Sequence, residues 1–374
     1  MNPSINYSGQ QIPIKQLVRM LYQEDPESAK MIWGEEPFEL ANAIQKFVLK
    51  KNIPAEYKEF VSSLPSCLPS DSLYVNVDKE AVRKSGMKLE KDSLGNEIIP
   101  DKMWIDVTSC DRFGKKTSES GRVYKSYMMM LEMIANSNFS RPLYMSTTVG
   151  PSNYNLLYKH FLQEGIAWRF TPYSYAKNSV QNTVADTDKM FDNMVNRYKY
   201  GNLSQPGLYI DETTMRMCYT QRRWFGVLIR QLLNEGKTDK ALAAAEKCEK
   251  EIPDYNVPHD YTSGSMDMVS AFLANGKTDK AEKIMNALQK KSVEYINWYE
   301  SLGDGHFKNN YIDIYTQITI LADIENAYRE ASESSKTEKE QKTFAKKAEE
   351  MDKTLQSFYI PFAQRCERLG INLR

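Results

Sequence analysis

Histidine is scarce in this sequence, and so are the short sequence motifs that are typical of enzyme active sites. The 374 residues contain three histidines, His160, His259 and His306, which lie far apart, and no HExxH pattern. A zinc site or a Ser/His/Asp triad is therefore not expected. No GxGxxG pattern and no P-loop occurs, so a standard nucleotide site is not expected either. The sequence predicts neither a metal nor a cofactor.

Net charge and long apolar runs are also missing. Lys+Arg number 49 and Asp+Glu number 49, which gives a net charge of zero. A neutral chain has no overall attraction to nucleic acid, so no nucleic-acid partner is expected. No stretch approaches the roughly 18 consecutive apolar residues of a membrane span, and the first 16 residues lack the apolar run of a signal peptide. Taken alone, the sequence predicts a soluble, untargeted chain.

Cysteine is present without a pattern. The five cysteines are an odd number at wide spacings, and no CxxC pair occurs among them, so neither a zinc site nor a disulfide framework is indicated. Cys248 falls on an apolar helical face, where a thiol packs as a small hydrophobic group. Cysteine usage leaves the redox compartment open. The five are Cys67, Cys110, Cys218, Cys248 and Cys366.

The composition and length of the sequence indicate a folded chain of more than one domain. Hydrophobic residues make up 41% and charged residues 26%, which is enough apolar mass for a core, and 374 residues favour two domains. Apolar residues recur at helical spacing in residues 14–21 and 38–48. The proline-containing stretch 64–69 then predicts a linker.

The middle of the chain alternates between strand and helix patterns. A turn is predicted at Gly95-Asn96, and Gly165 is expected to stop a helix. This alternation favours an α/β layer with some parallel pairing. The predicted strands are 73–77, 103–107, 142–149 and 166–173, and the predicted helices are 123–136 and 154–163.

Strand patterns fade after Asp188, and the loop at residues 200–207 predicts a domain boundary. Everything beyond it has helical period. The predicted fold class is α+β multidomain, with an N-terminal α/β layered domain followed by C-terminal all-α tetratricopeptide-like helical hairpins. The predicted domains are a helical lead-in at 1–70, an α/β domain at 71–205 and a helical repeat domain at 206–374.

One hexapeptide, Gly-Lys-Thr-Asp-Lys-Ala, occurs at 236–241 and again at 276–281, a register of 40 residues. Repeats of this period indicate stacked helical units. The glycine is expected to end one helix in a left-handed conformation. The threonine or the aspartate is expected to cap the next helix, and the alanine lets the two helices approach closely.

The flanks of the hexapeptide fit a tetratricopeptide unit. The apolar residues before and after each copy form facing helical stripes, and an insertion at 254–265 lengthens the usual period of about 34 residues. Residues 311–321 and 344–358 predict a third hairpin, with a charged linker at 332–342. The residues expected to shape the repeat turns are Gly236, Ala241, Pro253, Gly276 and Ala281.

Aromatic residues supply the candidate ligand contacts. Tyr295, Trp298 and Tyr299 cluster after the second repeat, and Tyr173 follows the fourth predicted strand. Helical spacing favours core packing for the cluster. Exposed rings would instead stack on sugars or anchor a peptide, and both interpretations stay open.

Weaker candidates lie at strand ends and in loops. Asp106, Thr147 and Thr148 fall at or near the ends of predicted strands, where an α/β site would form. His259-Asp260 would be a ligand or a base, although a polar loop pair is the favoured interpretation. His160 is expected to have a surface or packing role.

Three segments carry a family resemblance. The sequence reads FSRPLY at 139–144, EGIAWRFTP at 164–172 and YIDE at 209–212, ahead of the hexapeptide repeat. This order resembles a family of large bacterial membrane proteins with a many-helix membrane region and a soluble C-terminal region. They are similar to the eukaryotic transmembrane protein O-mannosyltransferases, of the lipid-donor glycosyltransferase class. The motif residues are Arg141, Pro142, Tyr144, Glu164, Gly165, Arg169, Pro172, Asp211 and Glu212.

The sequence departs from the family pattern at Phe139-Ser140, where tryptophan and a basic residue are usual, and at Phe170-Thr171, which replaces an aliphatic pair. The resemblance implies that this chain is the extracytoplasmic, periplasmic part of a longer inner-membrane protein. The catalytic carboxylate would lie in the membrane region, which this sequence lacks. The implied partners are that membrane region and a protein or peptide on the helical repeat surface.

Three functions remain open at this level. The first is an accessory module for acceptor recognition or assembly, which is not catalytic alone. The second is an independent enzyme, acting on a small molecule or sugar, with a pocket in the α/β section. The third is a purely structural domain. For Arg141 and Arg169, structural ion pairs with Asp211 or Glu212 are favoured over ligand contact.

Overall fold

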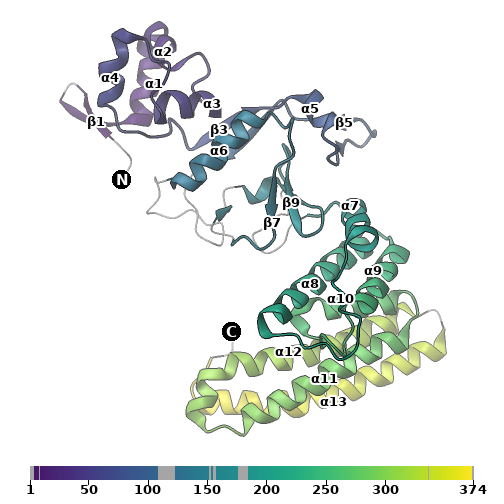
Figure 1. Ribbon diagram of the computed structural model, residues 1–374. Coiled ribbons are helices and arrows are strands. Elements are labelled where there is room, and N and C mark those ends of the chain that lie inside the picture. Colours follow the sequence, from purple (N-terminus) through teal and green to yellow (C-terminus); the bar gives the residue numbers. More distant parts are fainter. Residues whose placement is uncertain are drawn as a thin grey trace. The chain divides into compact units, whose positions relative to one another are not determined.

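A computed structural model describes residues 4–7, 9–107, 123–150, 153–154, 157–175, 184–335 and 337–372 (Figure 1). Cys110 lies outside them. The chain forms two compact units, residues 1–186 and 187–374, each of which is described by itself. The division precedes the loop at 200–207, because the short helices at 187–197 pack with the helices that follow them.

The first unit begins with small helices on an aromatic core. A β-hairpin that the sequence pattern did not reveal, β1 (Ser4–Tyr7) with β2 (Gln10–Pro13), comes first. Trp33 is fully buried and stacks on Phe47 at 5.3 Å between ring centroids. Helices predicted at 14–21 and 38–48 are confirmed. The helices are α1 (Ile14–Glu24), α2 (Pro26–Trp33), α3 (Leu40–Ala43), the π-helix η1 (Ile44–Val48), the 3-10 helix η2 (Ala55–Tyr57) and α4 (Lys58–Ser63).

The strands of this unit form several small sheets. Strand β3 pairs with β6, and β4 pairs with β5 around the predicted turn at Gly95. A three-stranded sheet has the order β7-β9-β8. The elements are β3 (Ser72–Asn76), α5 (Lys79–Lys84), β4 (Glu90–Lys91), β5 (Glu97–Ile98), β6 (Lys102–Asp106), α6 (Lys125–Ser137), β7 (Tyr144–Ser146), η4 (Tyr158–His160), β8 (Phe161–Gln163) and β9 (Ala167–Phe170).

Two predictions for this unit are wrong. The expected parallel pairing is absent from the named strands in the described residues, which all pair antiparallel; only the isolated bridges Glu39–Tyr74 and Gln163–Ala185 are parallel. The helix predicted at 154–163 is instead a 3-10 turn followed by β8. All three residues of β8 are buried, and periodicity does not separate a short, fully buried strand from a buried helical turn.

All regular elements in the described residues of the second unit are helices (Figure 1). Its helices form three hairpins there, α8 with α9, α10 with α11 and α12 with α13, and α10 also packs on α8 and α9. The third predicted hairpin is thereby confirmed. The elements are α7 (Thr187–Phe191), the π-helix η5 (Asp192–Arg197), α8 (Glu212–Asn234), α9 (Thr238–Glu251), the 3-10 helix η6 (Tyr261–Ser263), α10 (Ser265–Ala274), α11 (Thr278–Glu300), α12 (Asp304–Ser334) and α13 (Glu338–Arg368).

The two copies of the hexapeptide form the same turn. Gly236 and Gly276 have φ of 73° and 68°, as predicted from the residue type. In each copy the glycine N–H donates three residues back and the following lysine N–H donates five residues back, at 2.8–3.0 Å. This is the Schellman pattern, which satisfies the last carbonyls of α8 and α10. The predicted capping is wrong, because the lysines hold the N-cap positions and no side chain caps α9 or α11.

The second lysine of each hexapeptide binds a carboxylate on an earlier element. Lys240 bonds Asp188 of α7 at 2.7 Å, and Lys280 bonds Glu249 of α9 at 2.8 Å. Ala241 and Ala281 are both fully buried, as the close approach of the helices requires. The first copy therefore connects its hairpin to α7 and the second connects two successive hairpins, in addition to turning the chain.

Among the described helices, none is both long enough and apolar enough to cross a bilayer. The longest, α12 and α13, have 31 residues each and carry charged side chains along their length.

Candidate functional site

A polar cleft opens in the helical unit between the inserted loop, α11 and α12. Its volume is about 320 Å³. We call it the tyrosine cleft. Three tyrosines and three charged side chains are among the lining residues, which are Asp260, Tyr261, Thr262, Leu288, Lys291, Ser292, Tyr295, Tyr299, Asp313, Thr316, Gln317 and Ile320.

The predicted aromatic cluster forms one wall of this cleft and its rim. Tyr295 and Tyr299 line the cleft on successive turns of α11, with ring centroids 6.4 Å apart and planes within 30°. Trp298 contacts Tyr299 at 4.7 Å. Tyr295 is 42% exposed and Trp298 is 55% exposed. The rings therefore contribute accessible surface, and core packing does not account for Tyr295 and Trp298.

The inserted loop supplies the opposite polar groups. Lys291 on α11 bonds the Asp260 carboxylate at 3.0 Å, and Thr262 donates to the same carboxylate through its N–H and its hydroxyl. Burial acts to raise the pKa of Asp260, but the bonds from Thr262 and Lys291 outweigh it and lower the pKa. The Tyr261 hydroxyl donates to Asp323 on α12. Burial, together with this bond, raises the pKa of Tyr261 to about 12, so the phenol stays neutral.

Asp313 on α12 faces the aromatic wall. Burial raises the pKa of Tyr299, and the charge of the Asp313 carboxylate and a hydrogen bond to it raise the pKa further. Asp313 forms no ion pair with a described residue. The cleft therefore combines an exposed tyrosine, Tyr295, and a half-buried one, Tyr299, with one carboxylate that forms no ion pair with a described residue.

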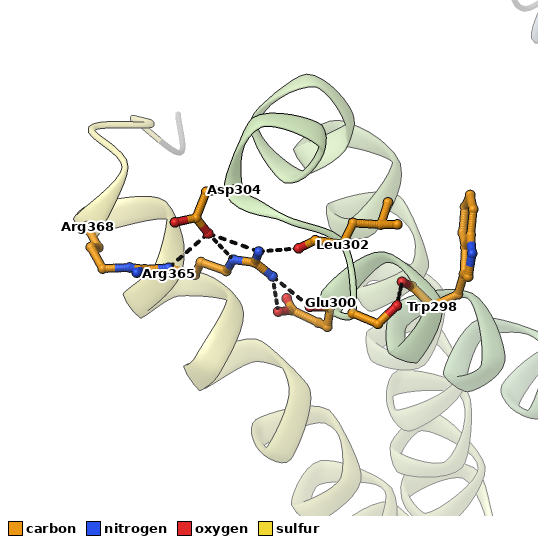
Figure 2. A network of polar contacts seen from close by, with 7 residues as sticks. Trp298, Glu300, Leu302, Asp304, Arg365 and Arg368 are labelled. Atoms are coloured by element: carbon orange, nitrogen blue, oxygen red, sulfur yellow. Dashed lines mark hydrogen bonds and ion pairs between the residues drawn. The ribbon is translucent and has the colours of Figure 1, made fainter.

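An arginine of α13 fixes the turn between α11 and α12. Figure 2 shows the Arg365 guanidinium between Glu300, Leu302 and Asp304, with Arg368 also bonded to Asp304, and the Trp298 ring pointing away from this network. Arg365 bonds the Glu300 carboxylate at 3.0 Å, the Leu302 carbonyl at 2.5 Å and Asp304 at 3.0 Å. All three guanidinium nitrogens of Arg365 donate hydrogen bonds. They fix the turn that follows the end of α11, where Trp298 and Tyr299 lie.

A second arginine holds the inserted loop. Arg222 of α8 is fully buried and donates to the carbonyls of Ile252, Val257 and Pro258 at 2.9, 2.5 and 2.9 Å. It forms no ion pair with a described residue. Sequence reasoning missed this residue. The available signal was an arginine at helical spacing within the apolar stripe that includes Cys218, because buried arginine needs several acceptors.

His259 belongs to this support and is not one of the cleft-lining residues. Its Nδ1 lies 3.2 Å from the Ser265 hydroxyl oxygen. Burial lowers the pKa of His259 to about 4, and the nearby Arg222 charge lowers it as well. The ring is uncharged at neutral pH. This placement fits the interpretation of His259-Asp260 as a polar pair within a loop. Asp260, its neighbour, is the residue that faces the cleft.

Three of the family-motif residues come together in the first unit. Arg169 and Glu164 are 2% and 4% exposed and form an ion pair at 3.4 Å. The Tyr144 hydroxyl donates to the same carboxylate at 2.7 Å, and Arg169 also donates to the Ser85 carbonyl at 2.6 Å. Burial and the Glu164 contact raise the pKa of Tyr144 to about 12. Gly165, with φ of 132°, permits the tight turn between β8 and β9.

The predicted ion pair of Arg169 with Asp211 or Glu212 is wrong, whereas the same prediction for Arg141 stays a prediction. Arg169 pairs with Glu164, which lies five residues away across the turn between β8 and β9. Arg141 is exposed and forms no ion pair within the described residues of the first unit. Asp211 instead caps α8, accepting from the Thr214 N–H at 3.0 Å. Glu212 pairs with Arg216 one turn later. Pro142 is exposed and Pro172 is buried.

The pocket beside Tyr144 is small and apolar. Its volume is about 90 Å³. The Thr147 hydroxyl bonds the Ile166 carbonyl at 3.0 Å, so that side chain has a structural partner, and Tyr173 is buried in the core at 7% exposure. Within the described residues, no group of three or more potential metal ligands occurs. The pocket lining is Met130, Met133, Ile134, Leu143, Tyr144, Met145, Leu157, Phe161 and Phe170.

Comparison with known proteins connects the first unit to a family. Residues 5–189 match the family model described as TMEM260-associated domain 2. The match includes Tyr144, Glu164 and Arg169 and ends before the hairpins that form the tyrosine cleft. It agrees with the resemblance found in the sequence, without extending to glycosyl transfer or to tetratricopeptide repeats. Neither a curated protein nor a solved structure matches the chain.

Proposed function

We propose that this chain, whose residues 5–189 are similar to TMEM260-associated domain 2, is an accessory module that binds a polypeptide in the tyrosine cleft. The module would serve acceptor recognition or assembly on the extracytoplasmic side of a glycosyltransferase-like membrane protein, with tetratricopeptide-like hairpins as its binding surface. The first unit would connect the hairpins to the membrane region.

The observation that carries the proposal is the exposed aromatic wall of the cleft. Tyrosine and tryptophan lose little conformational entropy on binding and dominate the energy of protein interfaces. Here Tyr295 and Tyr299 line an open volume of about 320 Å³ that also exposes carboxylate, hydroxyl and amide groups, and Trp298 contacts Tyr299 beside it. Arg365 and Arg222 keep the wall and the loop in place, which reduces the entropic cost of binding.

An enzymatic role for the first unit has less support. A catalytic pocket needs several polar groups that converge on one position. Tyr144 is the one lining residue with a hydroxyl, and that hydroxyl is already bonded to Glu164. Because the Arg169 charge is compensated by Glu164, the cluster is better suited to fixing the β7-β9-β8 sheet than to acting on a substrate.

The test is binding of the fluorescently labelled chain to an array of short peptides that tile proteins of the extracytoplasmic compartment. The double variant Tyr295→Ala/Trp298→Ala should lose at least about tenfold in signal, because each aromatic anchor contributes more than about 1 kcal/mol. The matched control is Tyr359→Ala/Ile360→Ala, which truncates two exposed apolar residues of α13 outside the cleft and should bind as the unmodified chain does. Equal loss in both variants, or no binding at all, would favour the structural role.

A further inference from the structure

We infer that the tyrosine cleft receives a basic side chain of the bound polypeptide, a lysine or an arginine, between the aromatic wall and Asp313. This inference rests on the proposed function, since it names the residue class that the cleft selects. It follows from three features of the cleft: its charge balance, its aromatic rings and the position of the Asp313 carboxylate, which has no ion pair with a described residue.

The charge balance of the lining is negative. The charged side chains that line the cleft are Asp260, Lys291 and Asp313. Lys291 is neutralised by Asp260 at 3.0 Å, which leaves the charge of Asp313 uncompensated among the described residues. An anionic ligand would meet this carboxylate without a free cation to offset it. A cationic ligand would instead gain a charge-assisted hydrogen bond.

The ring geometry suits the same ligand. Tyr295 and Tyr299 lie on successive turns of α11 with ring centroids 6.4 Å apart, and both line the cleft, so a ligand in the cleft meets two aromatic rings. A guanidinium or ammonium within about 6 Å of such rings is attracted by their negative faces. Asp313 is on the neighbouring helix α12 and lines the same cleft as Tyr299, and its charge raises the pKa of that tyrosine. A cation on the rings near Tyr299 is therefore also close to the carboxylate.

The experiment uses the full chain and two peptide arrays that differ only in charge. One array keeps every arginine and lysine, and the other replaces them with citrulline and acetyl-lysine, which preserve shape and remove charge. The unmodified chain should bind the charged array about five- to tenfold more strongly. Asp313→Asn should reduce the charged-array signal to the neutral level. The control Glu367→Gln, which changes an exposed carboxylate of α13 outside the cleft, should leave the preference intact.

The outcomes separate this inference from the proposed function. Equal binding to both arrays, lost in Tyr295→Ala/Trp298→Ala, would overturn the cationic preference and leave polypeptide binding standing. Binding to neither array would overturn both, as would binding to an oligosaccharide array alone. A charge preference that Asp313→Asn retains would place the cation elsewhere and overturn the assignment of Asp313.

Discussion

Each of the two units buries an arginine, and the two side chains are satisfied in opposite ways. Arg169 in the first unit is 2% exposed and is paired with a carboxylate, Glu164, which also accepts from Tyr144. Arg222 in the helical unit is fully buried and bonds three backbone carbonyls of one loop, with no ion pair to a described residue. The first arginine is neutralised by an opposite charge, and the second is stabilised by peptide dipoles.

The difference shows what each arginine holds in place. Arg169, Glu164 and Ser85 join a strand, a turn and a helix end in the first unit, so the pair fixes the relative positions of these elements. The acceptors of Arg222 all lie between residues 252 and 258, so this side chain determines the path of an insertion that has little regular structure. Carbonyls of an irregular loop need donors once they are buried, and a guanidinium offers five.

The largest expected effect comes from removing the carbonyl-bound arginine. Arg222→Met leaves three buried carbonyls without their donor, and we expect a loss of about 3–5 kcal/mol in the free energy of unfolding. Hydrogen exchange should increase first in the loop at 252–265. The control Arg223→Met, which removes an exposed neighbour bonded to the Thr262 carbonyl, should cost about 1 kcal/mol or less. Similar exchange in both variants would contradict the role assigned to Arg222.

The next effect tests the charge-paired arginine. Glu164→Gln keeps the shape of the side chain and leaves Arg169 buried with no carboxylate, which should destabilise the first unit by about 2–3 kcal/mol. The control is Glu97→Gln, which breaks an ion pair with Arg83 whose side chains are 43% and 51% exposed, and a cost below about 1 kcal/mol is expected. Urea unfolding of both variants measures the difference. An unchanged free energy of unfolding in Glu164→Gln would show that the ion pair does not stabilise the first unit.

Acidification should weaken the support of the tyrosine cleft. The pKa of His259 is about 4 in the folded state and 6.5 in the reference state, so the unfolded chain binds more protons between these values. Stability is therefore complete above about pH 6.5 and decreases as the pH falls toward 4, by about 2 kcal/mol between about pH 7 and pH 5. Thermal melting of His259→Gln should lack this decrease in the helical unit. If the variant still loses stability on acidification, other titratable groups cause the loss.

A parallel decrease is expected in the first unit. His160 is buried, with its ring nitrogens 2.7 and 3.2 Å from the carbonyl oxygens of Tyr173 and Trp104. Burial lowers the pKa of His160, so the stability of the first unit should also decrease as the pH falls, as for His259. His160→Gln should remove the acid sensitivity of the first unit alone, as judged by hydrogen exchange in each unit. Loss of acid sensitivity in both units would contradict the independence of the two histidines.

The smallest effect is expected at glycines with a left-handed backbone conformation, one in each unit. Gly86 and Gly276 have φ of 69° and 68°, and a Cβ at either position meets no atom within 4 Å. Alanine at each should cost about 1 kcal/mol, because the left-handed conformation is unfavourable for a residue with a Cβ. The control Gly305→Ala, in the first turn of α12 without a positive φ and with no atom within 4 Å of the added Cβ, should cause no loss of stability, because alanine favours a helix more than glycine does. Unequal costs at the first two positions would show that packing contributes in one unit.

The features that the sequence predicted best are those set by neighbouring residues. The turns at Gly236 and Gly276 follow from residue type, and the facing apolar stripes follow from periodicity. Contacts that connect distant segments were not predictable in the same way. Arg222 finds its acceptors 30 to 36 residues later, and Asp313 meets Tyr299 from the neighbouring helix. The aromatic half of the cleft was therefore predicted, and its charged half was not.

The first unit shows the same limit. Tyr144, Glu164 and Arg169 were grouped by a family resemblance, and the structure brings them together, but the predicted partners of Arg169 were wrong. Strand pairing was wrong for a related reason, because alternation along the chain identifies strands without stating their order or direction. The residues 161–163 are buried on both faces, so they carry no alternation at all.

The Arg365 network also has a consequence for the timing of folding during synthesis. The Leu302 carbonyl, in the turn between α11 and α12, accepts its hydrogen bond from a residue 63 positions later. At a translation rate of roughly 5–20 residues per second, that donor is made roughly 3–13 seconds after the turn. During this interval the rim of the tyrosine cleft lacks its guanidinium, and a ribosome-bound chain is expected to acquire binding competence only when α13 has emerged.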